Sequence, residues 1–227
     1  MNIKAILCDI EGTTTSVSFV YETLFPYFEQ HIGRLLTLLH DPVVAECFLQ
    51  IKQTLQQQGK PDASSADVLA KLRQWVLEDK KETTLKALQG IIWREGYLRR
   101  ELKGHLYDDV FPAFQAWHQQ GISLNIYSSG SVTAQKLLFA HTEKGDLTPI
   151  LNAYFDTTSG AKREVGSYQN ISQSLNLAAT DILFLSDIEA ELDAAKEAGL
   201  NTIQIVRAGT EKGSNHPIAH TFTEISS

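Results

Sequence analysis

Two carboxylates directly follow the first apolar run of the sequence. Asp9 and Glu11 come after residues 3–8, and Gly12 comes next. Carboxylates two residues apart can converge on one site if the chain turns there, and a glycine permits such a turn. One carboxylate could attack phosphorus and form an aspartyl-phosphate, while the other protonates the leaving oxygen and later deprotonates water. A polar loop closed by an Asx turn is the alternative for this stretch.

Ser128 and Ser129 follow another apolar run, residues 122–127. Hydroxyls and backbone N–H groups at the end of a strand can hold phosphate oxygens, helped by the positive end of the following helix. The S-S-G-S stretch also suits an ordinary turn or helix cap. It therefore predicts a phosphate-binding loop only in combination with the other residues.

Lys162 and Asp187 are candidates for two further roles, a positive charge beside the phosphate and a ligand for a metal ion. A phosphate and an attacking carboxylate in one pocket repel each other, and a lysine there would offset that repulsion. Asp187 follows the apolar residues 182–185, where an acidic residue can bind Mg²⁺, which prefers oxygen ligands. The metal would orient the phosphoryl group for in-line attack. The alternative for Lys162 alone is an ordinary solvated lysine on the surface. The alternative for Glu191 is an acidic residue at an exposed helix N-terminus, where negative charge is favourable.

The elements that must position these side chains alternate along the chain. Four short, nearly continuous apolar runs predict strands that are buried on both faces, at residues 3–8, 122–127, 182–185 and 202–206. Helical patterns lie at residues 113–120, 132–139, 168–177 and 188–198, and Ser131 is the predicted N-cap of the second. This order predicts an α/β fold with a doubly wound parallel sheet. Ligands of such sheets bind outside the carboxyl ends of the strands, where the polar clusters lie.

A long segment, residues 16–105, separates the first two predicted strands. Its apolar residues recur at helical spacing, at Phe25, Phe28, Ile32, Leu35, Leu36 and Leu39 and again at Val68, Leu69, Leu72, Trp75 and Val76. About ninety residues are too many for a loop in a compact fold. We therefore predict a helical cap domain lying over the site, inserted into a catalytic core of residues 1–15 and 106–227.

Composition and charge disfavour several classes of protein. The chain has 227 residues, 43% of them hydrophobic, which is enough for one core domain and a smaller one. A net charge of −7 argues against a nucleic-acid or anionic-membrane partner, and no apolar stretch approaches the ~18 residues of a membrane span. The two cysteines, Cys8 and Cys47, have no metal-binding spacing and suit a reducing, cytoplasmic setting.

The motifs together resemble those of one superfamily. D-I-E-G-T at residues 9–13, then Ser128, Lys162 and S-D at residues 186–187 with Glu191, occur in the order of the four motifs of the haloacid dehalogenase superfamily of phosphohydrolases. The helical insertion lies where that superfamily places one type of cap domain. Position 11 holds a glutamate where the usual first motif has a second aspartate.

One family within the superfamily fits the glutamate at position 11. The stretches D-I-E-G-T-T-T at residues 9–15, I-Y-S-S-G-S-V at 126–132, Y-F-D-T at 154–157 and S-Y at 167–168 resemble the enolase-phosphatase family of the methionine salvage pathway. The resemblance extends from Ile6 to about Arg207. It implies an enzyme that enolises a phosphorylated diketo methylthiopentane and then hydrolyses the phosphate to release an acireductone.

The resemblance also implies a cofactor and a ligand set. One Mg²⁺ per subunit would be bound by the carboxylates of Asp9 and Asp187 and by the backbone carbonyl of Glu11. The substrate phosphate would contact Lys162 and the pair Ser128 and Ser129. The small phosphorylated substrate is the expected partner, and the family implies a cytoplasmic monomer.

Enolisation needs a base near a carbon beside a carbonyl, and an electrophile for the developing enolate oxygen. Magnesium can supply the electrophile. Glu11 is a candidate base, because its extra methylene extends its reach. Aromatic residues of the insertion are candidates for a methylthio pocket, with core packing as the alternative: Tyr21, Phe25, Trp93 and Tyr97.

Two other functions are compatible with the sequence. The first is a small-molecule phosphatase of the same superfamily that lacks enolase activity. The second is a receiver-like binding module that accepts or senses phosphate without turnover, since it would have a similar sheet and an aspartate at a strand end. The long insertion and Lys162 count against the second alternative.

Overall fold

The computed structural model describes residues 3–80 and 82–225. The chain divides into two compact units. One consists of Met1–Val17 and Lys103–Ser227 and contains the sheet, and the other, Ser18–Leu102, is helical.

The sheet of the first unit has six parallel strands in the order β3-β2-β1-β4-β5-β6. They are β1 (Ala5–Cys8), β2 (Ser123–Tyr127), β3 (Ala153–Phe155), β4 (Ile182–Ser186), β5 (Asn201–Ile205) and β6 (Ile218–Ala219). β1 lies between β2 and β4, with Cys8 paired to Ile126 and to Leu185. This register brings the residues that follow the three strands to one edge of the sheet, as the parallel fold predicted.

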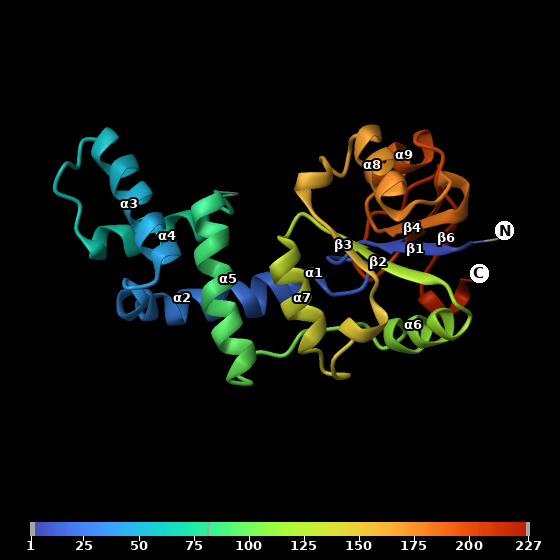
Figure 1. Cartoon of the computed structure of the whole chain (residues 1–227), viewed down its shortest axis with the longest axis horizontal. Coiled ribbons are helices and arrows are strands. Elements are labelled where there is room, and N and C mark those ends of the chain that lie inside the picture. The colour runs from blue at the N-terminus through green and yellow to red at the C-terminus, as the bar shows by residue number, and fades with distance from the viewer. Residues whose placement is uncertain (1–2, 81, 226–227) are drawn as a thin grey trace. The chain divides into compact units, whose positions relative to one another are not determined.

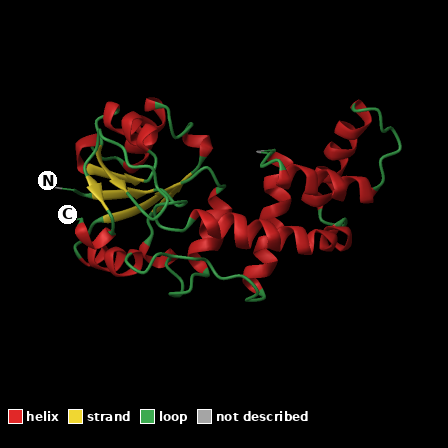
Figure 2. Ribbon diagram, turned by 180° about the vertical axis from the view of Figure 1, so that it is seen from behind, coloured by secondary structure: helices red, strands yellow, loops and turns green. Residues whose placement is uncertain are grey.

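Helices cover both faces of the sheet (Figures 1 and 2). α8 (Val165–Leu175) and α9 (Glu189–Glu197) lie on one face, and α6 (Val110–Gln119) lies on the other (Figure 1). α7 (Val132–Ala140) packs against β3. Every residue of β1 and β4 is buried, because each face of a doubly wound sheet is covered by helices.

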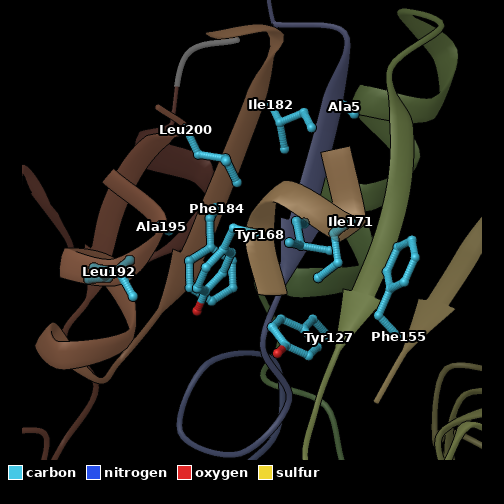
Figure 3. Packing of buried hydrophobic residues seen from close by; sticks show 12 residues of the cluster. Ala5, Tyr127, Phe155, Tyr168, Ile171, Ile182, Phe184, Leu192, Ala195 and Leu200 are labelled. Carbon is cyan, nitrogen blue, oxygen red and sulfur yellow. The ribbon is translucent and has the colours of Figure 1, made fainter. Parts of the chain in front are cut away.

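Buried hydrophobic residues of the sheet, α8 and α9 form one core cluster, in which Tyr127, Tyr168 and Phe184 lie close together (Figure 3). Tyr127, Tyr168 and Phe184 are fully buried. The ring centroids of Tyr127 and Tyr168 lie 5.7 Å apart, and those of Tyr168 and Phe184 lie 5.1 Å apart. Tyr127 is the residue before Ser128, so this packing fixes the strand end from which the Ser128 loop begins.

All four predicted strands and all four predicted helices of this unit are confirmed, with ends shifted by up to three residues. Ser131 caps α7 as predicted, since its side chain accepts a hydrogen bond from Ala134 N. The sequence patterns missed β3 and β6, which have three and two residues. Strands of that length are too short to show a periodic pattern.

The second unit consists mainly of α2 (Phe25–His31), α3 (Pro42–Gln57), α4 (Ser65–Leu77) and α5 (Thr83–Leu98). Short helices α1 (Val17–Phe19) and η1 (Val20–Leu24) precede them, and η2 (Ile32–Leu38) follows α2. Leu36 and Leu39, which the helical spacing groups with Ile32 and Leu35, are 42% and 39% exposed. η2 is a 3-10 helix with three residues per turn, so Ile32 and Leu35 stay buried while the α-helical pattern fails. Within residues 3–80 and 82–225, no helix has both the length and the hydropathy that a membrane span requires.

Candidate active site

Three of the predicted site residues follow the three central strands. Asp9 comes directly after β1, Ser128 after β2 and Asp187 after β4. Their exposed fractions are 4%, 6% and 9%. The parallel register therefore gathers two buried carboxylates and a buried hydroxyl at the carboxyl ends of neighbouring strands.

The loop that carries Asp9 folds back tightly against Asp187. The backbone N–H groups of residues 13–15 all donate to the Ile10 carbonyl, and Gly12 N donates to the Thr15 carbonyl at 2.7 Å. Gly12 has a φ of +76°, and a Cβ there would lie 2.2 Å from Asp187 Oδ2. Only glycine satisfies both the turn and this close approach.

Lys162 joins the nucleophile candidate to a further carboxylate. Its Nζ lies 2.6 Å from Asp9 Oδ1 and 2.6 Å from Glu191 Oε2, and the lysine is 8% exposed. Glu191 also accepts a hydrogen bond from Ser186 Oγ at 2.9 Å. Burial favours a low pKa for Lys162, but the two carboxylates outweigh it and raise the pKa above its ordinary value. The lysine is therefore charged at neutral pH.

The turn that delivers Lys162 is held by side chains at four consecutive backbone carbonyls. Tyr168 OH donates to the Lys162 carbonyl at 2.6 Å. The other three bonds are Asn170 Nδ2 to Ser159 O at 3.0 Å, Tyr127 OH to Gly160 O at 2.9 Å and Ser167 Oγ to Ala161 O at 2.6 Å. Sequence reasoning missed these roles, because a tyrosine hydroxyl at a helix position shows no pattern until its partner is known.

We expect Tyr168→Phe to lower the rate of phosphate release about tenfold, because an unanchored Lys162 carbonyl lets the lysine drift from Asp9. Loss of the buried hydrogen bond should also cost about 1–2 kcal/mol of the free energy of unfolding. Steady-state kinetics and thermal unfolding measure the two effects. Tyr154→Phe is the matched control, since the buried Tyr154 hydroxyl has no hydrogen-bond partner among the described residues. Equal kinetics in both variants would contradict the anchoring role.

The described site residues hold more negative than positive charge. Asp9, Asp187 and Glu191 face one lysine, Lys162. Burial, and secondly the charge of Asp9, raise the pKa of Asp187 to about 7. The same two causes raise the pKa of Glu191. A divalent cation would remove this repulsion, so the donor set fits magnesium chemically.

The ligands available to such an ion are few. Among residues 3–80 and 82–225, no group of three or more His, Cys, Asp or Glu side chains is arranged to hold a metal. Glu191 is already engaged by Lys162 and Ser186. Asp9, Asp187 and a backbone carbonyl would leave several positions to water, which is the coordination that Mg²⁺ favours.

The loop after β2 has a hydroxyl positioned for an anion. Ser128 Oγ accepts a hydrogen bond from Gly130 N at 3.1 Å and donates to no acceptor among the described residues. Gln135, buried in α7, fixes the loop by donating to the Gly130 and Phe155 carbonyls, each at 2.8 Å. Ser129 is exposed. Ser128 can therefore donate to a phosphate oxygen at the positive end of α7.

Glu11 lies beside Asp9 in sequence but is exposed. Its backbone forms a bridge with Thr15 that closes the loop. A further residue absent from the sequence prediction is Thr13, whose Oγ1 accepts a hydrogen bond from Asp187 N at 3.0 Å. The run of three threonines after Gly12 was a signal that could have indicated hydroxyl contacts of this kind.

Comparisons with known proteins identify the family of this chain. Residues 3–199 match the family described as haloacid dehalogenase-like hydrolase. The chain is 51% identical to the enolase-phosphatase E1 of Methylococcus capsulatus, covering 98% of this chain and 97% of that relative. It is 50% identical to the enolase-phosphatase E1 of Klebsiella pneumoniae, over 98% and 96% of the two chains.

Solved structures share the fold. The crystal structure of the UTR4 protein of Saccharomyces cerevisiae superposes with a TM-score of 0.82 at 33% identity, covering 99% of this chain and all of that one. A dehalogenase at 17% identity, covering 98% of this chain and 95% of its own, superposes with a TM-score of 0.59 and shares the fold alone. The family match and the two full-length relatives show that the chain belongs to the haloacid dehalogenase-like hydrolases and, within them, to the enolase-phosphatases.

Proposed function

We propose that the edge of the sheet after β1, β2 and β4 carries out both reactions of this family. The substrate is a phosphorylated diketo methylthiopentane of methionine salvage, which is enolised and then dephosphorylated to an acireductone. The observation that supports this site most directly is the buried contact of 2.6 Å between Asp9 Oδ1 and Lys162 Nζ, at the edge where the phosphate-loop hydroxyl also lies.

The two oxygens of Asp9 have different surroundings, and this difference supports Oδ2 as the attacking atom. Oδ1 accepts hydrogen bonds from Lys162 Nζ at 2.6 Å and from Ile10 N at 2.7 Å. Oδ2 accepts none among the described residues. In the proposed reaction, Oδ2 forms the bond to phosphorus as the bond to the ester oxygen breaks. Water then cleaves the aspartyl-phosphate and releases inorganic phosphate.

The remaining groups would handle charge and protons. Lys162 and the Ser128 hydroxyl stabilise the negative phosphoryl oxygens. Glu11 would protonate the leaving oxygen and deprotonate the attacking water, and it would also be the enolising base. One magnesium ion, held by the Asp9 and Asp187 carboxylates and the Glu11 carbonyl, would supply Lewis-acid stabilisation of the phosphoryl and enolate oxygens.

Magnesium binding should strengthen as pH rises towards 8. The ordinary pKa of Asp187 is 3.8, and its pKa in the folded protein is about 7. Between these two pH values, the folded protein carries a proton on Asp187 that the unfolded chain has lost. Metal-free stability should therefore fall as pH rises from about 4 to about 7. The ion must displace that proton, so its apparent affinity should improve about tenfold per pH unit below 7. The measurement is the rise in melting temperature at fixed Mg²⁺ between pH 6 and pH 8.

Asp187→Asn is the matched variant for that experiment. It removes the titrating group and one ligand, so magnesium should produce little rise in melting temperature at either pH. A rise in the unaltered protein that is equal at both pH values, or larger at pH 6, would contradict the assignment of Asp187.

Glu11→Asp should separate the two reactions. The shorter side chain withdraws the proposed base from the substrate carbon, so enolisation should fall about 10²-fold. Hydrolysis of a simple phosphate ester should fall less, because it requires no carbon acid. Enol absorbance and phosphate release, read in the same reaction with the diketo ester, give both rates. The exposed Glu143 provides the control Glu143→Asp; equal losses of both activities in Glu11→Asp would remove Glu11 from the enolisation step.

The same assay addresses the alternative of a phosphatase without enolase activity. That alternative predicts phosphate release from the diketo ester with no preceding enol absorbance. We also propose that the active species is a single chain with one ion. Light scattering of the active protein together with a magnesium titration tests this.

A further inference from the structure

Arg207, directly after β5 and Val206, is held by a bidentate ion pair and by aromatic rings. Its Nη1 and Nη2 each lie 2.9 Å from an oxygen of Asp109, the residue before α6. The guanidinium carbon lies 4.2 Å from the ring centroid of Tyr107 and 5.4 Å from that of Phe222. The Arg207 and Asp109 side chains are 7% and 14% exposed. Both charged groups are thus largely removed from water and fixed in orientation.

The same guanidinium holds the loop that carries the nucleophile. Nη2 and Nε donate to the Thr13 carbonyl at 3.1 and 3.3 Å. The side chain of Thr13 contacts Asp187, the candidate metal ligand after β4. Asp187 N donates a hydrogen bond to Thr13 Oγ1 at 3.0 Å. Thr13 therefore links the loop of Asp9 to Asp187, and Arg207 fixes the backbone of that link.

We propose that Arg207, oriented by Asp109, is a positioning residue for the magnesium site. It acts through Thr13 by fixing the separation of Asp9 and Asp187, and the inference rests on the magnesium site proposed above. Mg²⁺ demands near-ideal octahedral geometry, so small displacements of either carboxylate weaken binding. Residues that orient metal ligands typically change metal affinity by 10–100-fold when they are replaced.

The guanidinium is required for its shape as well as its charge. It holds the two carboxylate oxygens and the carbonyl at once through its planar set of donors. A lysine is a point charge on a flexible chain and cannot make this arrangement. Arg207→Lys should therefore keep the positive charge near Asp109 and lose the hold on Thr13.

The experiment titrates magnesium in Arg207→Lys and Arg207→Met. Two readouts are used: hydrolysis of a simple phosphate ester, and the rise in melting temperature with magnesium alone. We expect the half-saturating magnesium concentration to rise about 10–100-fold in both variants, and kcat at saturating magnesium to stay within about tenfold of the unaltered protein. A higher magnesium requirement with little change in kcat is the result expected for a positioning residue.

Three controls separate positioning from loss of stability. Asp108→Asn removes the neighbouring carboxylate, which forms an exposed pair with Lys144. Lys4→Met removes a cation from an exposed pair with Asp181. Ile171→Val weakens the buried core under α8 without touching Thr13. All three variants should have the same half-saturating magnesium concentration as the unaltered protein when they are assayed well below their melting temperatures.

The outcomes are distinct. A lower melting temperature in both Arg207 variants with an unchanged magnesium titration would overturn the proposal and leave a purely structural ion pair. If Arg207→Met does not fold, Arg207→Lys and Asp109→Asn give the same readouts. If magnesium fails to stabilise the unaltered protein, the proposed metal site itself is wrong, and the inference fails with it.

Discussion

Asp9→Asn should lower phosphate release by about 10⁴- to 10⁶-fold, the range for removal of a covalent nucleophile. An amide oxygen is a far weaker nucleophile than a carboxylate, so no aspartyl-phosphate forms. The fold should survive, because the amide has the same shape and its oxygen can still accept from Ile10 N and Lys162. Lys162 also keeps its contact of 2.6 Å with Glu191.

Phosphate release under single-turnover conditions measures the loss. Mass spectrometry of acid-quenched reactions should find a phosphoryl group on the unaltered protein and none on Asp9→Asn. Asp181→Asn is the control, since Asp181 forms an ion pair with Lys4, which is half exposed, at the start of β1. An Asp9→Asn protein that still turns over would end the assignment of the nucleophile.

Lys162→Met is expected to have the second-largest effect. It should lower activity about 10²- to 10³-fold, since the charged group that offsets phosphoryl repulsion is lost. Removing one partner of a buried ion pair should also cost about 3–5 kcal/mol of the free energy of unfolding. The pKa values of Asp187 and Glu191, already raised, would rise further without the lysine. Stability of the variant should therefore fall more steeply as pH rises through neutrality.

A double variant separates the structural and catalytic parts of that loss. Lys162→Met with Glu191→Gln restores the balance of buried charge, so it should regain stability but not activity. Denaturant unfolding and phosphate release measure the two. Lys144→Met, which breaks an exposed pair with Asp108, is the control and should change neither. Activity within tenfold of the unaltered protein in Lys162→Met would contradict the role of the lysine.

The strand-end residues could be predicted because a parallel sheet imposes their geometry. Apolar runs specify strands buried on both faces, and neighbouring parallel strands end at one edge. Asp9 and Ser128 directly follow such runs and Asp187 follows one after a single serine, so their proximity follows from local sequence and topology. The doubly wound fold and the position of the first motif at a strand end could be predicted for the same reason.

Other contacts depend on how whole elements pack. Lys162 follows no strand that the sequence predicts, and it reaches Asp9 because α8 holds its turn through Tyr168. Arg207 contacts Thr13 across 194 residues and Asp109 across 98. The pKa of Asp187 depends on burial and on Asp9, which a sequence does not display. Periodicity reports which face of an element is buried, whereas hydrogen-bond partners and desolvation are set only once the elements have packed together.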